Sequence, residues 1–495
     1  MDPSWLFGGW WGWLRPVFMV AHLLGLWVII SVLRQRKEPM VMLLWVVTLT
    51  LLPIVSVPLY VLIGERRVRR RGLRKRKRAA PVIRALASVT RADGETDEQH
   101  ESQRVVATAG MEESLQKLAQ ISNKFGYFPV TAGNKVEVFT TAQGIYDSII
   151  AAIDGAKDHI HLEYYIFRPD DTGRQVLDHL VEKAKSGVEV RLLLDGVGSW
   201  GTRNSFLRPL VKAGGRVDTF LPAIPLRRPW HLNCRNHRKV VVVDGQIGFT
   251  GSQNIGDEYR GRLRPIGPWK DTHLRLEGPA VRELQGVFVE DWYFASKEDL
   301  VSQKYVKRVP PAGDSLVQIV ATGPDQTTSI LSHIFFAALA LARKNVRIST
   351  PYFVPDPALI VSLQHAAYRG IEVEILIPAK TDNRVVLWAG RSFYDDLLVA
   401  GVKIHEFDHG MLHSKWVSID DHWTLISSAN VDIRSFLWNF EVTASVFDPR
   451  IAHTLLEDFR ADVARSRSIA RKSAKDIRLW PQVLEGAARL FAPLL

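Results

Sequence analysis

Two short stretches, far apart in the chain, carry the same reactive residues at the same spacing. They run from residue 235 to 254 and from 412 to 430. In each, a lysine lies two positions after a histidine, and an aspartate and a Ser-x-Asn pair follow. The matched pairs, all at one constant offset, are His237 and His413, Lys239 and Lys415, Asp244 and Asp420, Ser252 and Ser428, and Asn254 and Asn430. One such motif could arise by chance, but two with matching partners form a strong signal.

The motif residues suit chemistry on a phosphodiester. Residues two apart on a strand share a face, so each histidine and its lysine point the same way. A duplicated fold can bring two equivalent edges together about a pseudo-twofold axis, giving one pocket with two imidazoles and two ammonium groups. The lysines, Ser252, Asn254, Ser428 and Asn430 would bind phosphate oxygens as charge develops there. One imidazole could attack phosphorus while the other protonates the leaving oxygen.

Each imidazole also needs a carboxylate on its other nitrogen to orient it. Asp271 follows the first motif and Glu441 the second, and the distance from Asp271 to Gly278-Pro279 equals that from Glu441 to Asp448-Pro449. We therefore expect Asp271 to orient His237 and Glu441 to orient His413. Asp244 and Asp420 complete the two motifs and are counted with the histidines and lysines as catalytic candidates, although their place at hairpin turns fits a structural role at least as well. No metal or other cofactor is expected, because no cysteine or carboxylate is spaced as a zinc ligand set.

The elements that must position these residues alternate short β-branched runs with helical stretches, which favours an α/β fold. The order of elements recurs: residues 160–170 match 346–356, and 187–195 match 370–378. We expect two tandem α/β repeats over 111–300 and 313–470. The tail, 471–495, has amphipathic helical spacing, which fits packing on the domain or contact with a membrane.

The N-terminal segment, 1–64, contains two apolar runs at about 17–33 and 40–63. Their lengths predict a transmembrane helical hairpin, although the first run alone could be a signal peptide. Pro53 and Pro58 should kink the second helix or make it partly re-entrant. The segment 65–110 combines a block of Lys and Arg with an acidic linker, which favours a cytoplasmic catalytic region. The block, in a chain of net charge +12, would attract an anionic membrane surface.

The single cysteine, Cys234, lies three residues before His237 and could be a nucleophile. It has no counterpart in the second motif. Apolar packing is therefore the favoured interpretation.

The two motifs resemble those of the phospholipase D superfamily, and the resemblance to its bacterial cardiolipin synthases covers nearly the whole chain. It rests on R-N-H-R-K, F-T-G-S-Q-N-I-G-D-E-Y and P-W-K-D-T-H in the first copy, and on P-Y-F-V-P, L-H-S-K and N-F-E-V in the second. The chain departs from the family pattern at Gly251-Ser252, at Ser427-Ser428 and at Pro58. None of these departures removes a catalytic group.

The resemblance implies transfer of a phosphatidyl group from one phosphatidylglycerol to the hydroxyl of another, with release of glycerol. It implies that His237 is the nucleophile and His413 the general acid, then base. It also implies a multi-pass protein of the bacterial inner membrane. Three alternatives remain: the same chemistry with another donor or acceptor, a nuclease, and an inactive membrane scaffold. The apolar runs disfavour a nucleic-acid partner, and the intact motifs disfavour a scaffold.

Overall fold

The computed structural model describes residues 4–34, 39–63, 112–125, 128–222, 234–262, 267–301, 304–326, 328–471, 479–490 and 492. The predicted basic block and linker at 65–110 lie outside the described residues. Helix α6 (Glu113–Phe125) is the first described element of the 111–300 segment.

The first repeat alternates strands and helices as the sequence predicts. Its strands are β1 (Thr131–Phe139), β2 (His159–Tyr164), β3 (Glu189–Asp195), β4 (Arg216–Phe220), β5 (Val240–Val243), β6 (Ile247–Gly251), β7 (Trp269–Lys270) and β8 (His273–Glu277). Its helices are α7 (Ala142–Gly155), α8 (Asp171–Lys185), α9 (Asn204–Lys212) and α10 (Ala280–Ser296).

The second repeat follows the same plan with additional short elements. Its strands are β9 (Ser315–Thr322), β10 (Asn345–Ser349), β11 (Phe353–Val354), β12 (Glu372–Pro378), β13 (Lys403–Phe407), β14 (Met411–Leu412), β15 (Trp416–Ile419), β16 (Trp423–Ser427), β17 (Val431–Asp432), β18 (Glu441–Phe447) and β19 (Arg467–Ser468). Its helices are α11 (Ile330–Leu341), α12 (Pro357–Tyr368), α13 (Arg384–Arg391), α14 (Tyr394–Val399), α15 (Ile433–Leu437) and α16 (Pro449–Val463), and α17 (Leu479–Leu490) ends the described chain.

Local capping explains why equivalent helices begin at equivalent places. The side chain of Asp170 accepts a hydrogen bond from the Gly173 amide at the start of α8. Asp356 accepts one from the Leu359 amide at the start of α12, where Pro357 occupies the first turn. An aspartate at this position satisfies a backbone N–H that the helix itself leaves without a partner. The repeated R-P-D and V-P-D sequences therefore have the same structural outcome.

One mixed sheet of 15 strands contains both repeats, in the order β19-β13-β12-β10-β15-β16-β18-β9-β1-β8-β6-β5-β2-β3-β4. Apart from β19, the order read from either end meets corresponding strands of the two repeats. Strands β2, β3 and β4 pair in parallel, as do β10, β12 and β13. The two halves join where β1 pairs antiparallel with β9.

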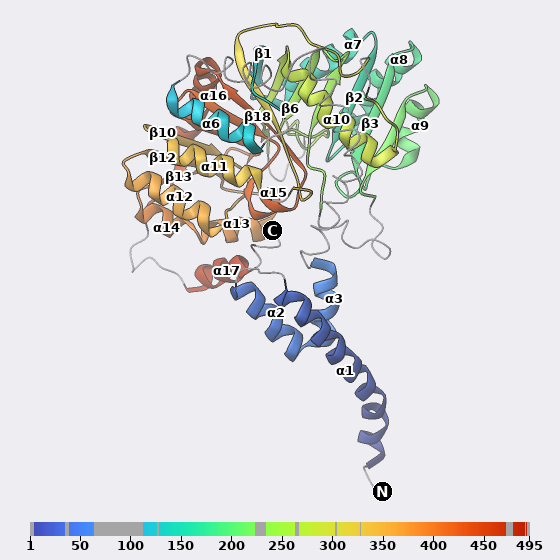
Figure 1. Cartoon of the computed structure of the whole chain (residues 1–495), viewed down its shortest axis with the longest axis vertical. Coiled ribbons are helices and arrows are strands. Elements are labelled where there is room, and N and C mark those ends of the chain that lie inside the picture. Colours follow the sequence, from blue (N-terminus) through green and yellow to red (C-terminus); the bar gives the residue numbers. More distant parts are fainter. Residues whose placement is uncertain are drawn as a thin grey trace.

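Three hydrophobic cores hold this sheet between helices (Figure 1). One core belongs to the first repeat, beneath α7, α8 and α9, and another to the second, beneath α11, α12 and α14. The third contains α10 and α16 together with strands of both repeats. Because this core is shared, burial of apolar surface stabilises the two repeats as one body.

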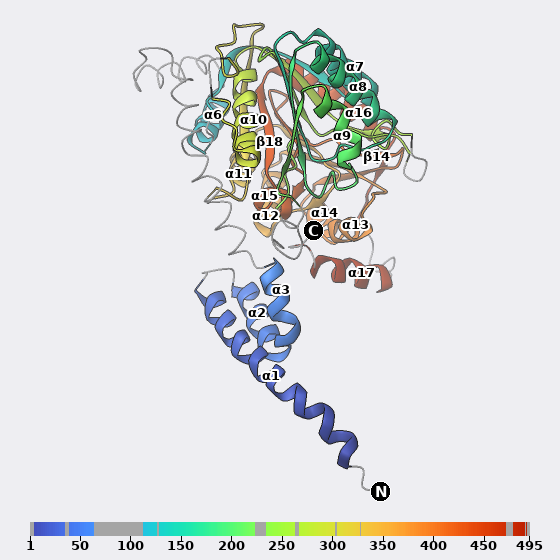
Figure 2. The ribbon, with the colours of Figure 1, turned by 90° about the vertical axis from the view of Figure 1, so that its right-hand side faces the viewer.

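The N-terminal segment forms three helices that lie at one end of the molecule (Figures 1 and 2): α1 (Ser4–Leu33), α2 (Pro39–Leu51) and α3 (Pro53–Ile63). Within α1, Pro16–Leu33 is long and apolar enough to cross a membrane, the one such helix in the described chain. The three helices pack together through Val28, Val32 and Leu49.

The interruption that Pro53 predicts in the second apolar run, 40–63, is present. The run divides at Leu52 into α2 and α3, which have 13 and 11 residues. Pro53 begins α3, because its ring and missing N–H disfavour continuation of a helix through that point. Pro58 instead stays inside α3. Each of the two helices is shorter than the roughly 20 residues that a bilayer span requires.

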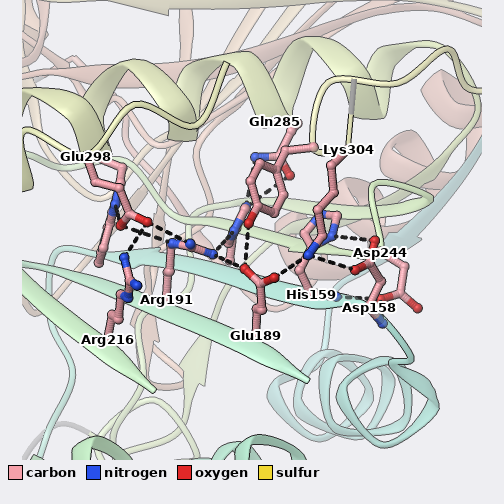
Figure 3. Close-up of polar contacts among 12 residues, drawn as sticks. Asp158, His159, Glu189, Arg191, Arg216, Asp244, Gln285, Glu298 and Lys304 are labelled. Atoms are coloured by element: carbon pink, nitrogen blue, oxygen red, sulfur yellow. Dashed lines mark hydrogen bonds and ion pairs between the residues drawn. The ribbon is translucent and has the colours of Figure 1, made fainter. Parts of the chain in front are cut away.

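A network of ion pairs outside the predicted site ties the end of α10 to the sheet (Figure 3). Arg191 on β3 pairs with Glu189 at 2.9 Å and with Glu298, after α10, at 2.8 Å. Lys304 also pairs with Glu189. The network therefore holds the segment that follows α10 against β3.

His161 on β2 lies beneath this network and is fully buried. Its ring stacks on Phe288 with centroids 4.5 Å apart, and its Nδ1 lies 3.2 Å from the Gln285 side-chain oxygen. Burial lowers the pKa of His161 well below its usual value, and nearby positive charge on Arg191 acts in the same direction. The folded protein therefore holds this imidazole in its neutral form.

We predict that His161 makes the fold sensitive to acid. The unfolded chain binds a proton at His161 below about pH 6.5 but the folded chain does not, which costs ~1.4 kcal/mol of unfolding free energy per pH unit. His161→Asn should therefore lose fewer degrees of melting temperature than the parent between pH 7 and pH 5, measured in detergent. His365→Asn, at an exposed histidine, is the matched control. Equal losses in parent and His161→Asn would contradict this assignment.

Candidate active site

Each of the two histidines lies where the backbone of its motif hydrogen-bonds to the other repeat. The backbone N–H of His237 donates to the carbonyl of Phe440, at 2.9 Å. The backbone N–H of His413 donates to the carbonyl of Lys270, at 2.7 Å. Strand β14, just before His413, also pairs in parallel with β7 of the first repeat. Each motif is thus held in place by the other repeat's backbone.

The orienting carboxylates are exchanged between the repeats. Nδ1 of His237 lies 3.0 Å from Glu441, and Nδ1 of His413 lies 2.6 Å from Asp271. The prediction that Asp271 orients His237 and Glu441 orients His413 is therefore wrong in its pairing, although it names the right residues. The reason is topological. Asp271 follows β7 and Glu441 follows Phe440, and these are the segments that pair with the opposite motif.

Ser252 and Ser428 support these carboxylates and are not placed as phosphate ligands. The hydroxyl of Ser252 donates to Asp271 at 2.7 Å, and that of Ser428 donates to Glu441. Both serines are fully buried. The sequence prediction that they bind phosphate is therefore corrected to a positioning role. A buried carboxylate needs such donors, because burial of an unpaired charge is costly.

Asp244 and Asp420 lie at tight turns, both with positive φ, of 54° and 55°. The carboxylate of Asp244 accepts from the backbone amides of residues 157–159 at 2.8–3.0 Å. That of Asp420 accepts from the amides of residues 343–345 at 2.7–3.2 Å. Their inclusion among the predicted catalytic residues is corrected: the geometry supports the structural alternative, in which each aspartate ties a hairpin to the start of a neighbouring strand.

The two motif lysines are bound to the backbone of the histidines and are not among the residues that line the cavity described below. Nζ of Lys239 donates to the carbonyl of His237 at 2.6 Å, and Nζ of Lys415 donates to that of His413 at 2.9 Å. Both side chains are buried. Burial lowers the pKa of Lys415 to about 8 and also lowers that of Lys239. One hydrogen bond leaves each ammonium with further protons to donate to an anion.

Burial disfavours the charged form of both imidazoles. Burial lowers the pKa of His237 to about 4, against the opposing effect of Glu441. Burial likewise lowers the pKa of His413. For Asp271, burial raises the pKa, but His413, Lys415 and Ser252 outweigh it and bring the pKa to about 2. A neutral imidazole whose Nδ1–H is held by a carboxylate keeps its lone pair on Nε2.

A cavity of about 360 Å³ brings His237, His413, Asn254 and Asn430 together. The other lining residues, which the sequence interpretation did not assign to the site, are Tyr165, Ile166, Arg235, Tyr259, Trp269, Tyr352, Asp382, Asn383, Val386, Asp432, Arg434 and Asn439. Many of them lie in strings that recur between the copies, such as E-Y-Y-I-F and P-Y-F-V-P. The recurrence of these strings was a signal that they belong to the site. Nothing in the sequence indicated the direction in which their side chains point.

The cavity differs between its two histidines. The ring of Trp269 lies 5.0 Å from that of His413, and Tyr259 lies 5.9 Å away. The residues at the equivalent positions in the second repeat are Asn439 and Ser435. Asn439 donates to the carboxylate of Glu441 at 3.3 Å. The surroundings of His413 are therefore aromatic where those of His237 are polar, although Tyr165 also packs against His237, at 4.9 Å.

Cys234 is buried beside the site, and burial raises the pKa of its thiol to about 12. It packs in the shared hydrophobic core, which supports the apolar interpretation. No group of three or more His, Cys, Asp or Glu that could hold a metal ion occurs within the described ranges.

We predict that the two residues of each exchanged histidine–carboxylate pair are coupled in their effect on the free energy of unfolding. Double-mutant cycles on the free energy of unfolding should give a coupling of about 0.5–3 kcal/mol for His237→Ala with Glu441→Gln, and for His413→Ala with Asp271→Asn. The cycle that combines His237→Ala with Asp271→Asn is the matched control, and its coupling should be smaller. A larger coupling in the control than in the exchanged pairs would refute the geometry.

A second prediction distinguishes a structural role of Asp420 from a catalytic one. Asp420→Ala should lower the unfolding free energy by at least ~2 kcal/mol, because several backbone amides lose a charged acceptor. Specific activity per folded molecule should stay within about twofold of the parent. Asp271→Asn provides the contrast, with a fall in activity of about a hundredfold or more. A similar loss of activity per folded molecule in both variants would restore a chemical role to Asp420.

Comparison with known proteins agrees with this geometry. Residues 149–261 and 335–463 match the family model described as cardiolipin synthase, PLD-like domain. The chain is 36% identical to a cardiolipin synthase of Alkalihalophilus pseudofirmus over 99% of this chain and 95% of that protein. It is 35% identical to the major cardiolipin synthase of Bacillus subtilis over 97% and 99%.

Among solved structures, a phosphatidylserine synthase of Haemophilus influenzae shares the fold, with a TM-score of 0.58 and 13% identity over 77% of this chain and all of that one. With full-length relatives at this level of identity, the chain belongs to the family of phospholipase D-like cardiolipin synthases.

Proposed function

We propose that this protein transfers a phosphatidyl group from one phosphatidylglycerol to a hydroxyl of another, producing cardiolipin and glycerol. The observation that carries the proposal is the single cavity in which two carboxylate-held imidazoles meet. Two such imidazoles suit a two-step displacement, because a neutral one can bind phosphorus while a protonated one gives its proton to the leaving oxygen. The full-length relatives named as cardiolipin synthases support this choice of substrate.

His237 acts as the nucleophile and His413 as the general acid in the first step. His413 enters the first step protonated on both ring nitrogens, with Nδ1–H held by Asp271. Nε2 of the neutral His237 bonds to phosphorus, the bond from phosphorus to the glycerol oxygen breaks, and Nε2–H of His413 gives its proton to that oxygen. In the second step His413 takes the proton from the incoming hydroxyl, whose oxygen displaces His237. Lys239, Lys415, Asn254 and Asn430 bind the phosphoryl oxygens, where negative charge develops.

The two repeats, 111–300 and 313–470, form one pseudo-twofold catalytic unit. The symmetric strand order and the exchanged carboxylates support this arrangement. Each repeat contributes one histidine, one lysine and one asparagine, so a single chain supplies the whole site.

The enzyme works at the bacterial inner membrane, anchored by the N-terminal hairpin of 1–64 with its catalytic region on the cytoplasmic side. Exposed apolar side chains along Pro16–Leu33 support the anchor. The charge of the 65–110 segment favours retention at an anionic surface that contains phosphatidylglycerol. Both substrates are lipids, so a membrane-bound enzyme meets them without extracting them into water.

Incubation of the purified protein with labelled phosphatidylglycerol in vesicles tests the reaction. We expect cardiolipin and glycerol in equal amounts. Phosphatidic acid without cardiolipin would indicate a hydrolase, and a product from added phosphatidylethanolamine alone would indicate another donor.

The histidine roles require a separate measurement. His413→Ala should accumulate an acid-labile phosphoenzyme with activated lipid donors, whereas His237→Ala should form none. The reverse result would exchange the two roles. Absence of a phosphoenzyme in both variants, with turnover by the parent, would argue against a covalent step.

A further inference from the structure

The C-terminal helix α17 is docked on the catalytic body by one narrow face. Ala488 is buried against the second repeat's core. The guanidinium of Arg489 lies 4.3 Å from the ring centroid of Phe393 and 3.9 Å from the carboxylate of Asp396. Arg489 also donates to the carbonyl of Ser392, at 3.4 Å. These contacts fix the helix beside α13 and α14.

The opposite face of α17 is apolar and is largely exposed among the residues that the structure describes. Its large side chains are Leu479, Trp480, Val483, Leu484 and Leu490, of which Trp480 is 74% exposed and Leu490 81%. On a helical projection at 100° per residue, these five side chains cluster on an arc centred away from Arg489. Exposed Gln482 and Gly486 lie between this apolar arc and the docked face. The described part of the catalytic body therefore does not bury the apolar half of α17.

Helix α17 packs on a helix that borders the catalytic cavity at its other end. Helix α13, on which α17 packs, begins at the cavity and contributes Val386 to its lining, and its cap residue Asn383 lines the cavity too. Val385, one residue away, is 38% exposed, and Leu437 on α15 is 45% exposed. Val385 and Leu437 are therefore exposed apolar side chains on the two helices, α13 and α15, that follow cavity-lining residues.

The arrangement of the chain identifies what covers this face. Figures 1 and 2 show α17, α13 and α15 at the end of the catalytic body that is nearest to α1–α3. Helix α1 contains the segment that can cross a membrane. A tryptophan and aliphatic side chains on one side of a short helix are typical of helices that lie in the interface of a bilayer.

We propose that the apolar face of α17 lies in the lipid interface and holds the mouth of the cavity at the membrane surface. The location of this contact rests on the proposed membrane-bound function. Helix α17 thereby gives the catalytic body a second attachment, independent of the N-terminal helices. Because α17 packs on α13, this attachment also sets the orientation of the cavity relative to the lipid headgroups.

Site-specific fluorescence tests the contact. Cys234 is the chain's single cysteine and is buried with a raised thiol pKa, so an introduced cysteine can be labelled selectively. Full-length Val483→Cys and the matched control Gln482→Cys carry an environment-sensitive dye in phosphatidylglycerol vesicles. We expect a blue-shifted emission and quenching by spin-labelled lipid at position 483, and weaker effects at 482.

Two fluorescence outcomes overturn the proposal. Equal and weak quenching at both positions means that the face remains in water. A blue shift at 483 that is insensitive to spin-labelled lipid and grows with the protein-to-lipid ratio means that a second copy of the chain covers it.

A kinetic measurement separates the membrane contact from folding and from catalysis. Trp480→Glu with Val483→Glu should lower turnover of vesicle phosphatidylglycerol about tenfold and leave turnover of a monomeric short-chain phosphatidylglycerol unchanged. Gln482→Glu with Gly486→Glu adds the same charge outside the apolar arc, and a side chain at Gly486 meets no atom within 4 Å. This control should retain turnover of both substrates.

Loss of turnover on both substrates in the Trp480 and Val483 variant would assign α17 to folding or catalysis and overturn the proposal. Unchanged turnover on vesicles would overturn it as well. Failure of the proposed function is recognised separately, because the parent protein would then form no cardiolipin from either substrate.

Discussion

The structure depends on two buried hydrogen bonds between imidazole and carboxylate, each made across the boundary between the repeats. Glu441 and Asp271 have no access to water, so their charges rely on the histidines, lysines and serines around them. A buried charge that loses such partners is strongly destabilising, and partners displaced by small distances also lose catalytic geometry. The shared core of α10 and α16 and the continuous sheet satisfy this requirement, because they prevent the repeats from sliding relative to each other.

Much of this arrangement was predictable from the sequence. The alternation of elements, the duplication and the paired His, Lys and Asn residues follow from periodicity and from a constant offset between copies. The pairing of carboxylates did not follow, because spacing along the chain favours a local partner and carries no information about which strand edges meet. Glu441 reaches His237 because Phe440 bonds to the backbone of the first motif, a contact between segments some two hundred residues apart.

Other errors had different physical origins. A polar residue that recurs at a fixed distance from a motif shows that the position matters, but it does not show which atom the side chain contacts. Ser252 and Ser428 were therefore predicted to bind phosphate, whereas they donate to the carboxylates. Asp244 and Asp420 recur because two turns need the same amide acceptor. In the second apolar run the interruption expected at Pro53 occurs, whereas Pro58, which has the same ring and missing N–H, stays inside α3.

The exchange of carboxylates also bears on how such a chain could arise and diverge. A one-repeat ancestor with this geometry would have had no complete histidine–carboxylate pair in a single copy, and would have been active only as a pair of identical chains. Fusion of the two genes removes the requirement for identity while keeping the exchange. Positions such as Trp269 and Asn439 could then differ, so that selection could give two formerly interchangeable histidines separate duties.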